Sequence, residues 1–356
     1  MPSADAINPE AMRAALLDWY DREGRTLPWR IRPEDREAGR KPDPYAVWLS
    51  EIMLQQTTVP HATPYWERFL ARWPSVQDLA AAPREDVLAA WAGLGYYARA
   101  RNLHACAHLV AEELGGRLPE HLEALRALPG VGEYTANAIR AAAFDKPASV
   151  VDGNVERVIT RVFAIETPLP KAKPEIKRLA ASLADTDRPG DYAQALMDLG
   201  ATVCTPKSPR CGACPWSKAC AAHAAGTETR YPIKAKKTPK PVRRGVCFHV
   251  IAPDGLWLRR RPETGLLGGM MELPGSEWTA DAPAPDEAAP FQADWREAGA
   301  VRHVFTHFQL ELRVLCAHAP QGWRPPEGRF VALHDLDEAG LPSVMMKAAR
   351  SGLTLF

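Results

Sequence analysis

The sequence predicts two domains, a mainly helical one followed by a smaller α+β one. The chain has 356 residues, 46% of them hydrophobic, which is enough for two separate cores. From residue 9 to about 225 apolar residues recur at helical spacing, whereas short alternating runs dominate after residue 245. We therefore expect a helical domain at 1–225, a linker at 226–244 and an α+β domain at 245–356.

Helices joined by Pro/Gly turns account for the first domain. No segment there alternates convincingly with period two, as a half-buried strand would. Ala- and Leu-rich segments with helical periodicity run over Ala11–Tyr20, Val87–Trp91, Arg101–Leu114 and Ile176–Leu183.

A tight turn joins two further predicted helices at 122–143. Helical Leu122–Leu128 leads into the string Leu-Pro-Gly-Val-Gly, and a second helix follows through Ile139 to Ala143. Gly130 and Gly132 permit close approach to free backbone N–H groups, which can hold a DNA phosphate without distinguishing base sequence. Most GxG turns are plain turns, but the complete string is typical of a helix-hairpin-helix.

A basic stretch separates the two predicted domains. Between Arg230 and Arg244 lie seven basic side chains, three prolines and no acid. Two hypotheses remain open, a solvated spacer and a strap that contacts phosphates.

Strand patterns define the second domain. Val246–Ile251 and Leu256–Arg261 flank a Pro-Asp-Gly turn, and apolar residues alternate with polar ones from Phe308 to Val314. Residues 279–290, rich in Ala, Pro and Asp, are predicted to form a loose loop.

Charge and hydropathy indicate the cellular compartment of the protein but do not identify its binding partner. The net charge is only +1, so any nucleic-acid footprint must be local. The first ten residues contain acids where a signal peptide needs a basic start, and no apolar run approaches ~18 residues. We expect a cytoplasmic protein without a membrane association.

Four of the seven cysteines fall within seventeen residues, with six, two and five residues between successive sulfurs. They are Cys204, Cys211, Cys214 and Cys220. An intracellular chain of this length is not expected to build a disulfide framework. Structural zinc sites usually show two close pairs, whereas only one is present here, so the spacing favours an iron–sulfur cluster over zinc. Spacing alone leaves both open.

Five longer strings resemble the adenine DNA glycosylase (MutY) family of the endonuclease III-like superfamily. They are Leu27–Arg30, Trp48–Thr57, Gly93–Asn102, Val151–Asn154 and Met197–Ala201. The resemblance implies a helix-hairpin-helix DNA glycosylase fold whose cysteine loop at 204–220 holds one [4Fe–4S] cluster. It also implies a monomer that acts in base excision repair on double-stranded DNA, removing adenine mispaired with 8-oxoguanine or guanine.

Two carboxylates would carry this chemistry. Breaking an N-glycosidic bond needs an acid for the leaving base and an anion for the oxocarbenium-like sugar. Glu51 lies in an apolar segment that would raise its pKa and keep it protonated, which makes it the predicted acid. Asp152, in a Gly-containing turn near backbone amides, is the predicted anion, which would face the cationic sugar or bond with it transiently. The resemblance implies that Asn154 orients the site through hydrogen bonds.

Position 134 separates two chemistries within the superfamily. Relatives that also cut the DNA backbone carry a lysine there, whose amine attacks the sugar. This chain has Tyr134, and a phenol cannot form an imine. We therefore expect a monofunctional glycosylase in which Tyr134 stacks on the reacting nucleotide or hydrogen-bonds near it.

Extruding the adenine leaves a gap in the base stack that side chains must fill. The resemblance assigns that role to Gln56 and Tyr96. It places Arg30 and Gln194 at the base pocket, where they would contact the adenine edge.

The second domain resembles the Nudix-like recognition domain of the family, on the string Gly265–Pro274. The carboxylate set of a Nudix hydrolase is missing after Gly275, so hydrolysis is not expected. The string His303–Phe308 resembles the loop that probes 8-oxoguanine, which implies a DNA-binding role for Phe305, Thr306 and His307. Phe308 is more simply explained as a core residue.

Two other hypotheses compete with this one. The first is a bifunctional endonuclease III-like glycosylase and lyase, against which Tyr134 and the second domain argue. The second is a non-catalytic iron–sulfur protein that binds DNA, against which the presence of both Glu51 and Asp152 argues.

Overall fold

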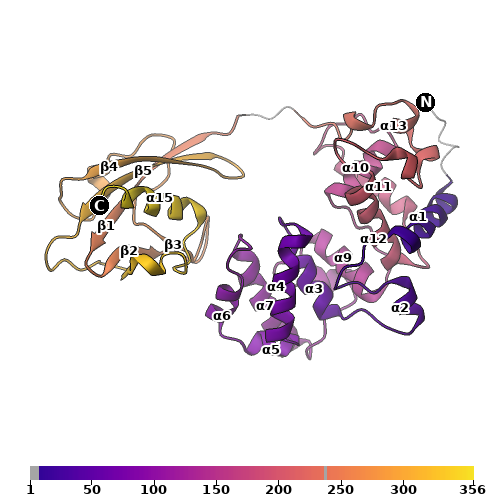
Figure 1. The fold of residues 1–356 in the computed structure, drawn as a ribbon, viewed down its shortest axis with the longest axis horizontal. Coiled ribbons are helices and arrows are strands. Elements are labelled where there is room, and N and C mark those ends of the chain that lie inside the picture. Colours follow the sequence, from indigo (N-terminus) through magenta and orange to yellow (C-terminus); the bar gives the residue numbers. More distant parts are fainter. Residues whose placement is uncertain (1–7, 236–238) are drawn as a thin grey trace. The chain divides into compact units, whose positions relative to one another are not determined.

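The computed structural model describes residues 8–235 and 239–356. The chain forms two compact units that divide after residue 236. The predicted fold class is confirmed, because the first unit is helical and the second is α+β (Figure 1). The expectations for the first seven residues, and for the linker cations Lys236 and Lys237, lie outside the described residues.

The helices of the first unit follow one another with short connections, and local signals fix several of their ends. Asn8 caps α1 by accepting from the backbone N–H groups of Glu10 and Ala11, and Ser75 and Asp78 form a reciprocal capping box at α5. The α-helices are α1 Pro9–Glu23, α2 Pro33–Glu37, α3 Pro44–Met53, α4 Val59–Arg72, α5 Val76–Ala81, α6 Arg84–Ala90, α7 Ala98–Glu113, α8 Leu122–Arg126, α9 Glu133–Phe144, α10 Gly153–Val162, α11 Lys173–Leu183, α12 Pro189–Asp198 and α13 Ala221–Ala224. A π-helix, η2 Leu199–Val203, extends α12, and the 3-10 turns are η3 Cys211–Ala213, η4 Ser217–Ala219 and η5 Glu228–Arg230.

Two hydrophobic cores divide the helical unit. One gathers apolar side chains from α3 to α9, with Trp48 and Trp91 fully buried. The other joins α1 to α10, α11 and α12, and includes Trp216, whose indole N–H donates to the Met12 carbonyl. Helices α3 and α9 of the first core and α10 and α12 of the second contribute side chains to one cavity of this unit, together with the segments 25–31 and 54–59.

The predicted helix-hairpin-helix at 122–143 corresponds to α8, a turn and α9. Gly130 has a φ of 76°, which a side chain rarely adopts, and a Cβ there would lie 2.8 Å from Asn102 Cβ. Gly132 precedes α9 and has open space around its Cα, so its backbone can approach a ligand closely. Gly130 is therefore needed for the turn, whereas Gly132 provides an open backbone at the surface.

Both ends of the basic stretch after the cysteines belong to folded parts of the chain. Tyr231 is buried, its hydroxyl donates to Glu166, and Arg230 forms an ion pair with the same carboxylate. On the other side, Val242 already begins the first strand of the second unit. Among its described residues, the connection between the units is therefore short.

A six-stranded mixed sheet forms the second unit, in the order β3-β2-β1-β5-β4, with β6 paired to β2. The strands are β1 Val242–Ala252, β2 Gly255–Arg260, β3 Met271–Glu272, β4 Arg296–Val304, β5 Gln309–His318 and β6 Arg329–Val331. β1 and β5 run parallel, and the other pairs are antiparallel. Both predicted early strands are confirmed, as is the alternation after Phe308, whose side chain is buried in the core.

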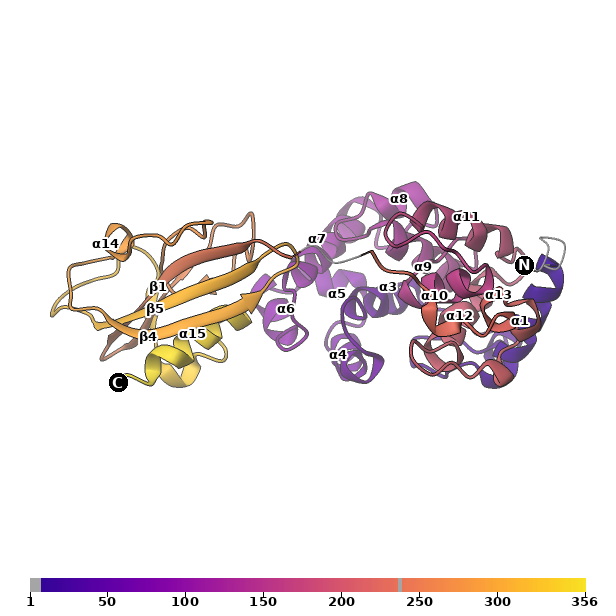
Figure 2. The same ribbon diagram turned by 90° about the horizontal axis from the view of Figure 1, so that it is seen from above.

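Helix α15 Ser343–Leu353 covers one face of this sheet, against β4 and β5 (Figure 2). A 3-10 turn, η6 Leu333–Asp335, precedes it. The expected loose loop at 279–290 is wrong in one detail, because Pro285–Ala288 forms the short helix α14. Proline at its first position and two acids in the first turn favour this helix start. In the described part of the chain, no helix is long and apolar enough to cross a membrane.

Candidate active site

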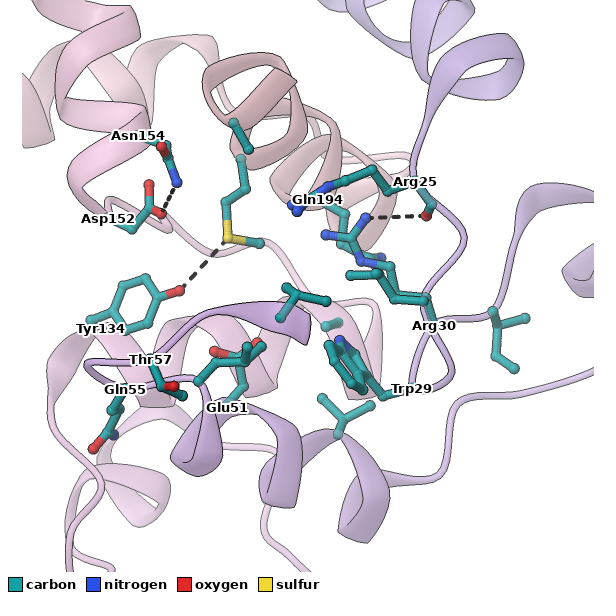
Figure 3. Close-up of a pocket in the computed structure, with 18 residues that line it drawn as sticks. Arg25, Trp29, Arg30, Glu51, Gln55, Thr57, Tyr134, Asp152, Asn154 and Gln194 are labelled. Carbon is teal, nitrogen blue, oxygen red and sulfur yellow. Dashed lines mark hydrogen bonds between the residues drawn. The ribbon is translucent and has the colours of Figure 1, made fainter. Parts of the chain in front are cut away.

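One cavity of about 230 Å³ lies between the two cores of the helical unit (Figure 3). This volume is near the small end of ligand sites, which usually span ~300–1,000 Å³. It suits a single nucleobase better than a larger ligand. Six of the predicted site residues line it, namely Arg30, Glu51, Tyr134, Asp152, Asn154 and Gln194. The first two come from the N-terminal hundred residues and the other four from the hairpin onward.

Glu51 projects from α3 into this cavity (Figure 3). Its neighbours on the helix, Val47 and Ile52, are buried in the first core. Burial raises the pKa of Glu51 to about 7, the Arg30 guanidinium opposes this, and the Asp152 carboxylate adds to it. A carboxyl with this pKa keeps much of its proton at neutral pH, which is what a general acid needs.

Asp152 is the N-cap residue of α10, and its two oxygens have separate partners. Oδ1 accepts from the backbone N–H of Val155 at 2.7 Å, and Oδ2 accepts from the Asn154 amide at 2.9 Å (Figure 3). These two donors fix the orientation of the Asp152 carboxylate at the start of the helix. Asn154 in turn is held by Arg157, whose Nη2 donates to Asn154 Oδ1 at 2.9 Å.

Arg30 does not present a free guanidinium to the cavity. Its Nη1 and Nη2 donate to the two carboxylate oxygens of Asp198, at 2.8 and 3.0 Å. Arg25 donates to the same carboxylate through its backbone N–H and its Nε. These guanidinium groups hold the pKa of the buried Asp198 carboxyl below its usual value, although burial opposes them. Arg25 and Arg30 therefore line one wall of the cavity with their guanidinium groups already bound to a carboxylate behind it.

Tyr134 and Gln194 line the cavity from α9 and α12. The Tyr134 hydroxyl donates to Met197 Sδ at 3.6 Å, and burial together with the Glu51 carboxylate raises the pKa of this phenol strongly. Gln194 is buried, and its amide N–H donates to the Gly190 carbonyl within its own helix. Neither residue is a nucleophile in this state.

Gln56 and Tyr96 lie outside the cavity, on two surface turns. Both have left-handed backbones, with φ of 60° and 50°, and the Tyr96 side chain is 66% exposed. The buried guanidinium of Arg99 joins the two turns. It donates to the carbonyls of Ile52, Met53, Gln55, Leu94 and Gly95.

The five carbonyl partners of Arg99 fix the positions of both turns. Strained backbones held in this way are common at functional sites.

The four clustered cysteines line one small cavity, together with Arg161 and Glu228. Arg161 comes from α10 and donates to Cys204 Sγ at 3.2 Å and to the Thr205 carbonyl at 2.8 Å. One turn earlier, Arg157 donates to the Cys204 carbonyl at 2.7 Å. Helix α10 therefore carries Asp152 at its start and contacts the cysteine loop through two later arginines.

The only compact set of potential metal ligands in the described ranges is Cys211, His223 and Glu228. Their ligand atoms lie within 4.8 Å of one another, which holds for no three of the cysteines there. All four cysteines nevertheless line the same cavity, so they can serve together as ligands of one metal centre.

In the second unit, the predicted recognition residues form the turn between β4 and β5. The Phe305 N–H donates to the Phe308 carbonyl at 2.9 Å and closes this turn. Thr306 and His307 are exposed at its tip, whereas Phe305 is half-buried. The tip of the turn is therefore exposed to a partner, whereas the Phe305 side chain packs against the rest of the unit.

Sequence reasoning did not single out several residues that shape the site. Asp198 lies in one of the family-like strings but was not expected to bind Arg30, which is 168 positions away. Arg157 was missed altogether, because its partners come from distant segments and leave no signal in the sequence of the helix. Gln55, whose amide donates to Thr135 Oγ1 at 3.1 Å, joins α3 to α9.

Comparison with known proteins agrees with this geometry. Residues 49–184 match the family described as HhH-GPD superfamily base excision DNA repair protein, and residues 246–351 match the NUDIX domain. The adenine DNA glycosylase of Homo sapiens is 36% identical over 97% of this chain and 74% of its own length. That of Mus musculus is 35% identical over 98% and 79%. A solved structure of a thermostable thymine-DNA glycosylase has 30% identity and a TM-score of 0.54, covering 61% of this chain and 97% of that one.

Proposed function

The chain belongs to the adenine DNA glycosylases, and on that basis we propose that it removes adenine opposite 8-oxoguanine or guanine in duplex DNA without cutting the backbone. As an adenine DNA glycosylase, it is an enzyme of base excision repair. The proposal concerns the mispair that it selects, the residues that act, the cluster and the absence of a lyase step. A cytoplasmic enzyme that associates with DNA and works as a monomer fits this activity.

Glu51 is the proposed general acid. In the extruded nucleotide, its proton passes to the adenine ring as the bond between C1′ and the base breaks, so the base leaves neutral. The raised pKa of about 7 supports this role, because an ordinary glutamate would be ionised. The Glu51 carboxylate formed in this step then accepts a proton from the water that attacks C1′.

Asp152 is the proposed anion beside the developing sugar cation. Its carboxylate lines the same cavity as Glu51 and is held by Val155 and Asn154, so it needs no reorganisation during the reaction. Asn154 acts by orienting this carboxylate. The two acids thus have different tasks because their surroundings differ.

The composition of the cavity supports a glycosylase without lyase activity. No lysine is present among the described residues that line it, and position 134 holds a buried phenol. An imine with the sugar needs a primary amine. Water is therefore the proposed nucleophile.

The hairpin and the two surface turns support DNA binding by the helical unit. The open backbone at Gly132 and the adjoining start of α9 suit a phosphate, with Gly130 shaping the turn. Gln56 and Tyr96 are proposed to fill the space left by the extruded adenine. In the second unit, Phe305, Thr306 and His307 are proposed to contact the opposite base, whose oxidation changes its hydrogen-bonding edge.

The four cysteines are proposed to hold one [4Fe–4S] cluster. Its role is structural, since it would fix the loop that carries Lys207, Arg210 and Lys218 toward DNA phosphates. The N–H···S bond from Arg161 to Cys204 is of the kind that stabilises a thiolate ligand.

The observation that carries the proposal is the single cavity that brings Glu51 and Asp152 together. The experiment measures single-turnover excision on duplexes with adenine opposite 8-oxoguanine, guanine, cytosine or thymine. We expect fast excision from the first two only, and a loss of about 10²–10⁴-fold in Glu51→Gln. Unchanged excision in Glu51→Gln would refute the mechanism, and efficient borohydride trapping on DNA would refute the absence of a lyase step.

A further inference from the structure

The exposed tip of the turn between β4 and β5 is supported by a cluster of three aromatic rings. The Phe305 ring stacks on Phe308 with centroids 4.8 Å apart, and Trp278 lies 5.8 Å from Phe305 and 6.5 Å from Phe308. Two guanidinium groups pack on this cluster, with Arg243 4.5 Å from the Phe308 ring and Arg261 5.1 Å from the Trp278 ring. Phe305 thus contacts both other rings, while its neighbours Thr306 and His307 are exposed.

Trp278 packs at a defined position on the sheet, against Gly245 of β1. A Cβ at Gly245 would come within 2.5 Å of Trp278 Cδ1, so the indole lies where β1 has no side chain. The segment that carries Trp278 is bound to β1 by backbone bonds, including a reciprocal pair between Arg244 and Thr279 of 2.7 and 3.0 Å. The ring therefore belongs to the rigid sheet although it lies in no strand.

A second contact holds the backbone of the same turn. The Lys240 ammonium donates to the Phe305 carbonyl at 2.6 Å. Phe305 is therefore fixed by Trp278 at its ring and by Lys240 at its carbonyl. Sequence analysis treated Lys240 as part of a spacer or a phosphate strap, and this bond supports neither role.

We propose that Trp278, seated on Gly245, is a positioning residue for the choice between 8-oxoguanine and guanine, and that Lys240 assists it. The inference rests on the proposed function of the Phe305–His307 turn. The two bases differ by a few polar atoms, so discrimination depends on where the tip places its donors and acceptors. Without the indole, Phe305 loses a half-buried neighbour and the tip loses its fixed position.

The test measures the ratio of excision rates for adenine opposite 8-oxoguanine and opposite guanine at limiting enzyme, in the full-length protein. We expect Trp278→Leu to lower this ratio about tenfold and Trp278→Phe, which keeps a ring, to restore most of it. Gly245→Ala should lower the ratio as well, because its methyl group displaces the indole. Lys240→Met should have a smaller effect of the same sign.

Trp295→Leu is the matched control. Trp295 is also a half-buried tryptophan of the second unit, but it packs on Phe248 and Phe291 on the other face of the sheet. We expect a similar loss of thermal stability and no change in the ratio. A fall in Trp295→Leu equal to that in Trp278→Leu would mean general destabilisation and would overturn the inference.

His307→Ala separates this inference from the function on which it rests. If His307→Ala loses the preference and Trp278→Leu keeps it, the recognition turn stands and the role of Trp278 is refuted. If the unmodified enzyme shows no preference for 8-oxoguanine, the proposed function fails and the inference fails with it.

Discussion

At Glu51, the proposed role as a general acid conflicts with the stability of the folded chain. Its side chain lies where burial makes ionisation unfavourable, with a second acid in the same cavity. The ion pair of Arg30 with Asp198 offsets only part of this, because the Asp198 carboxylate already neutralises the guanidinium. We therefore expect an amide at this position to be more stable than the carboxyl at neutral pH.

Excision should depend on pH through Glu51. A raised pKa of about 7 means that the acid is protonated below that pH and loses its proton above it. We expect the single-turnover rate on adenine opposite 8-oxoguanine to level off below about pH 7 and to fall roughly tenfold per pH unit above it. A rate that stays constant to pH 9 would contradict the assignment.

The same residue should make the stability of the helical unit depend on pH. Below the unfolded pKa of 4.5 the side chain is protonated in both states, and between 4.5 and about 7 only the unfolded state releases its proton. Stability is therefore lost as pH rises through this window. Glu51→Gln should therefore stabilise the protein more at pH 8 than at pH 4. The difference between the two effects on the free energy of unfolding should be at most about 3 kcal/mol.

Denaturant unfolding at the two pH values measures this gain. Glu175→Gln, at an exposed position of α11, serves as the control, and its effect should not change between them. An equal gain for both variants would argue against a buried Glu51 charge.

Site residues that stand in a short recognisable string could be picked out from the sequence. Residues whose role depends on partners far away in the chain could not. Glu51 and Asp152 stand in recognisable strings, and the structure places both at one cavity. Arg99 stands in such a string too, but its carbonyl partners come from two separate segments of the chain. Their convergence is a property of the folded chain and leaves no local pattern.

At the scale of elements, α10 is the helix on which most of the site depends. Asp152 caps its start, Arg157 and Arg161 bind the cysteine loop, and the π-helix η2 packs against its first turn. A shift at that packing contact would move the Asp152 carboxylate directly.

Gly200 in η2 makes this contact testable. A Cβ there would lie 2.6 Å from Asn154 Cβ and 3.0 Å from the Asn154 carbonyl. Gly200→Ala should therefore displace the start of α10 and lower the excision rate by at least about tenfold, with a moderate loss of stability. Gly212→Ala is the control, because a methyl group added there would have no neighbour within 4 Å. Equal rates for both variants would show that the contact is unimportant.

Element types were predictable because periodicity and turn residues are local signals. The hairpin and the strands around Gly255 lie where the sequence indicates them. The ends of the basic stretch were not predictable, because Tyr231 is held by Glu166, a residue 65 positions earlier. Composition alone cannot distinguish a solvated cation from one with a tertiary partner.

At the scale of the whole molecule, the two units have separate cores. We expect residues 8–235 and 239–356 to fold when produced separately, each with a cooperative thermal transition. The first should excise adenine opposite guanine and lose most of its preference for 8-oxoguanine. Circular dichroism checks folding, and the rates on the two duplexes check the division of labour. A helical unit that folds and keeps the full preference would contradict it.

The short connection between the units has a geometric consequence. The Ala235 N–H is bonded to the Leu169 carbonyl, and the Pro241 carbonyl to the Gln309 N–H, so only residues 236–240 lie between fixed points. However these five residues are arranged, they span no more than ~20 Å. That length corresponds to about six base-pair steps of B-DNA at ~3.4 Å each. Once one unit has bound DNA, a tether of this length gives the other unit a high effective concentration for the same duplex, so we expect the two units to bind DNA cooperatively.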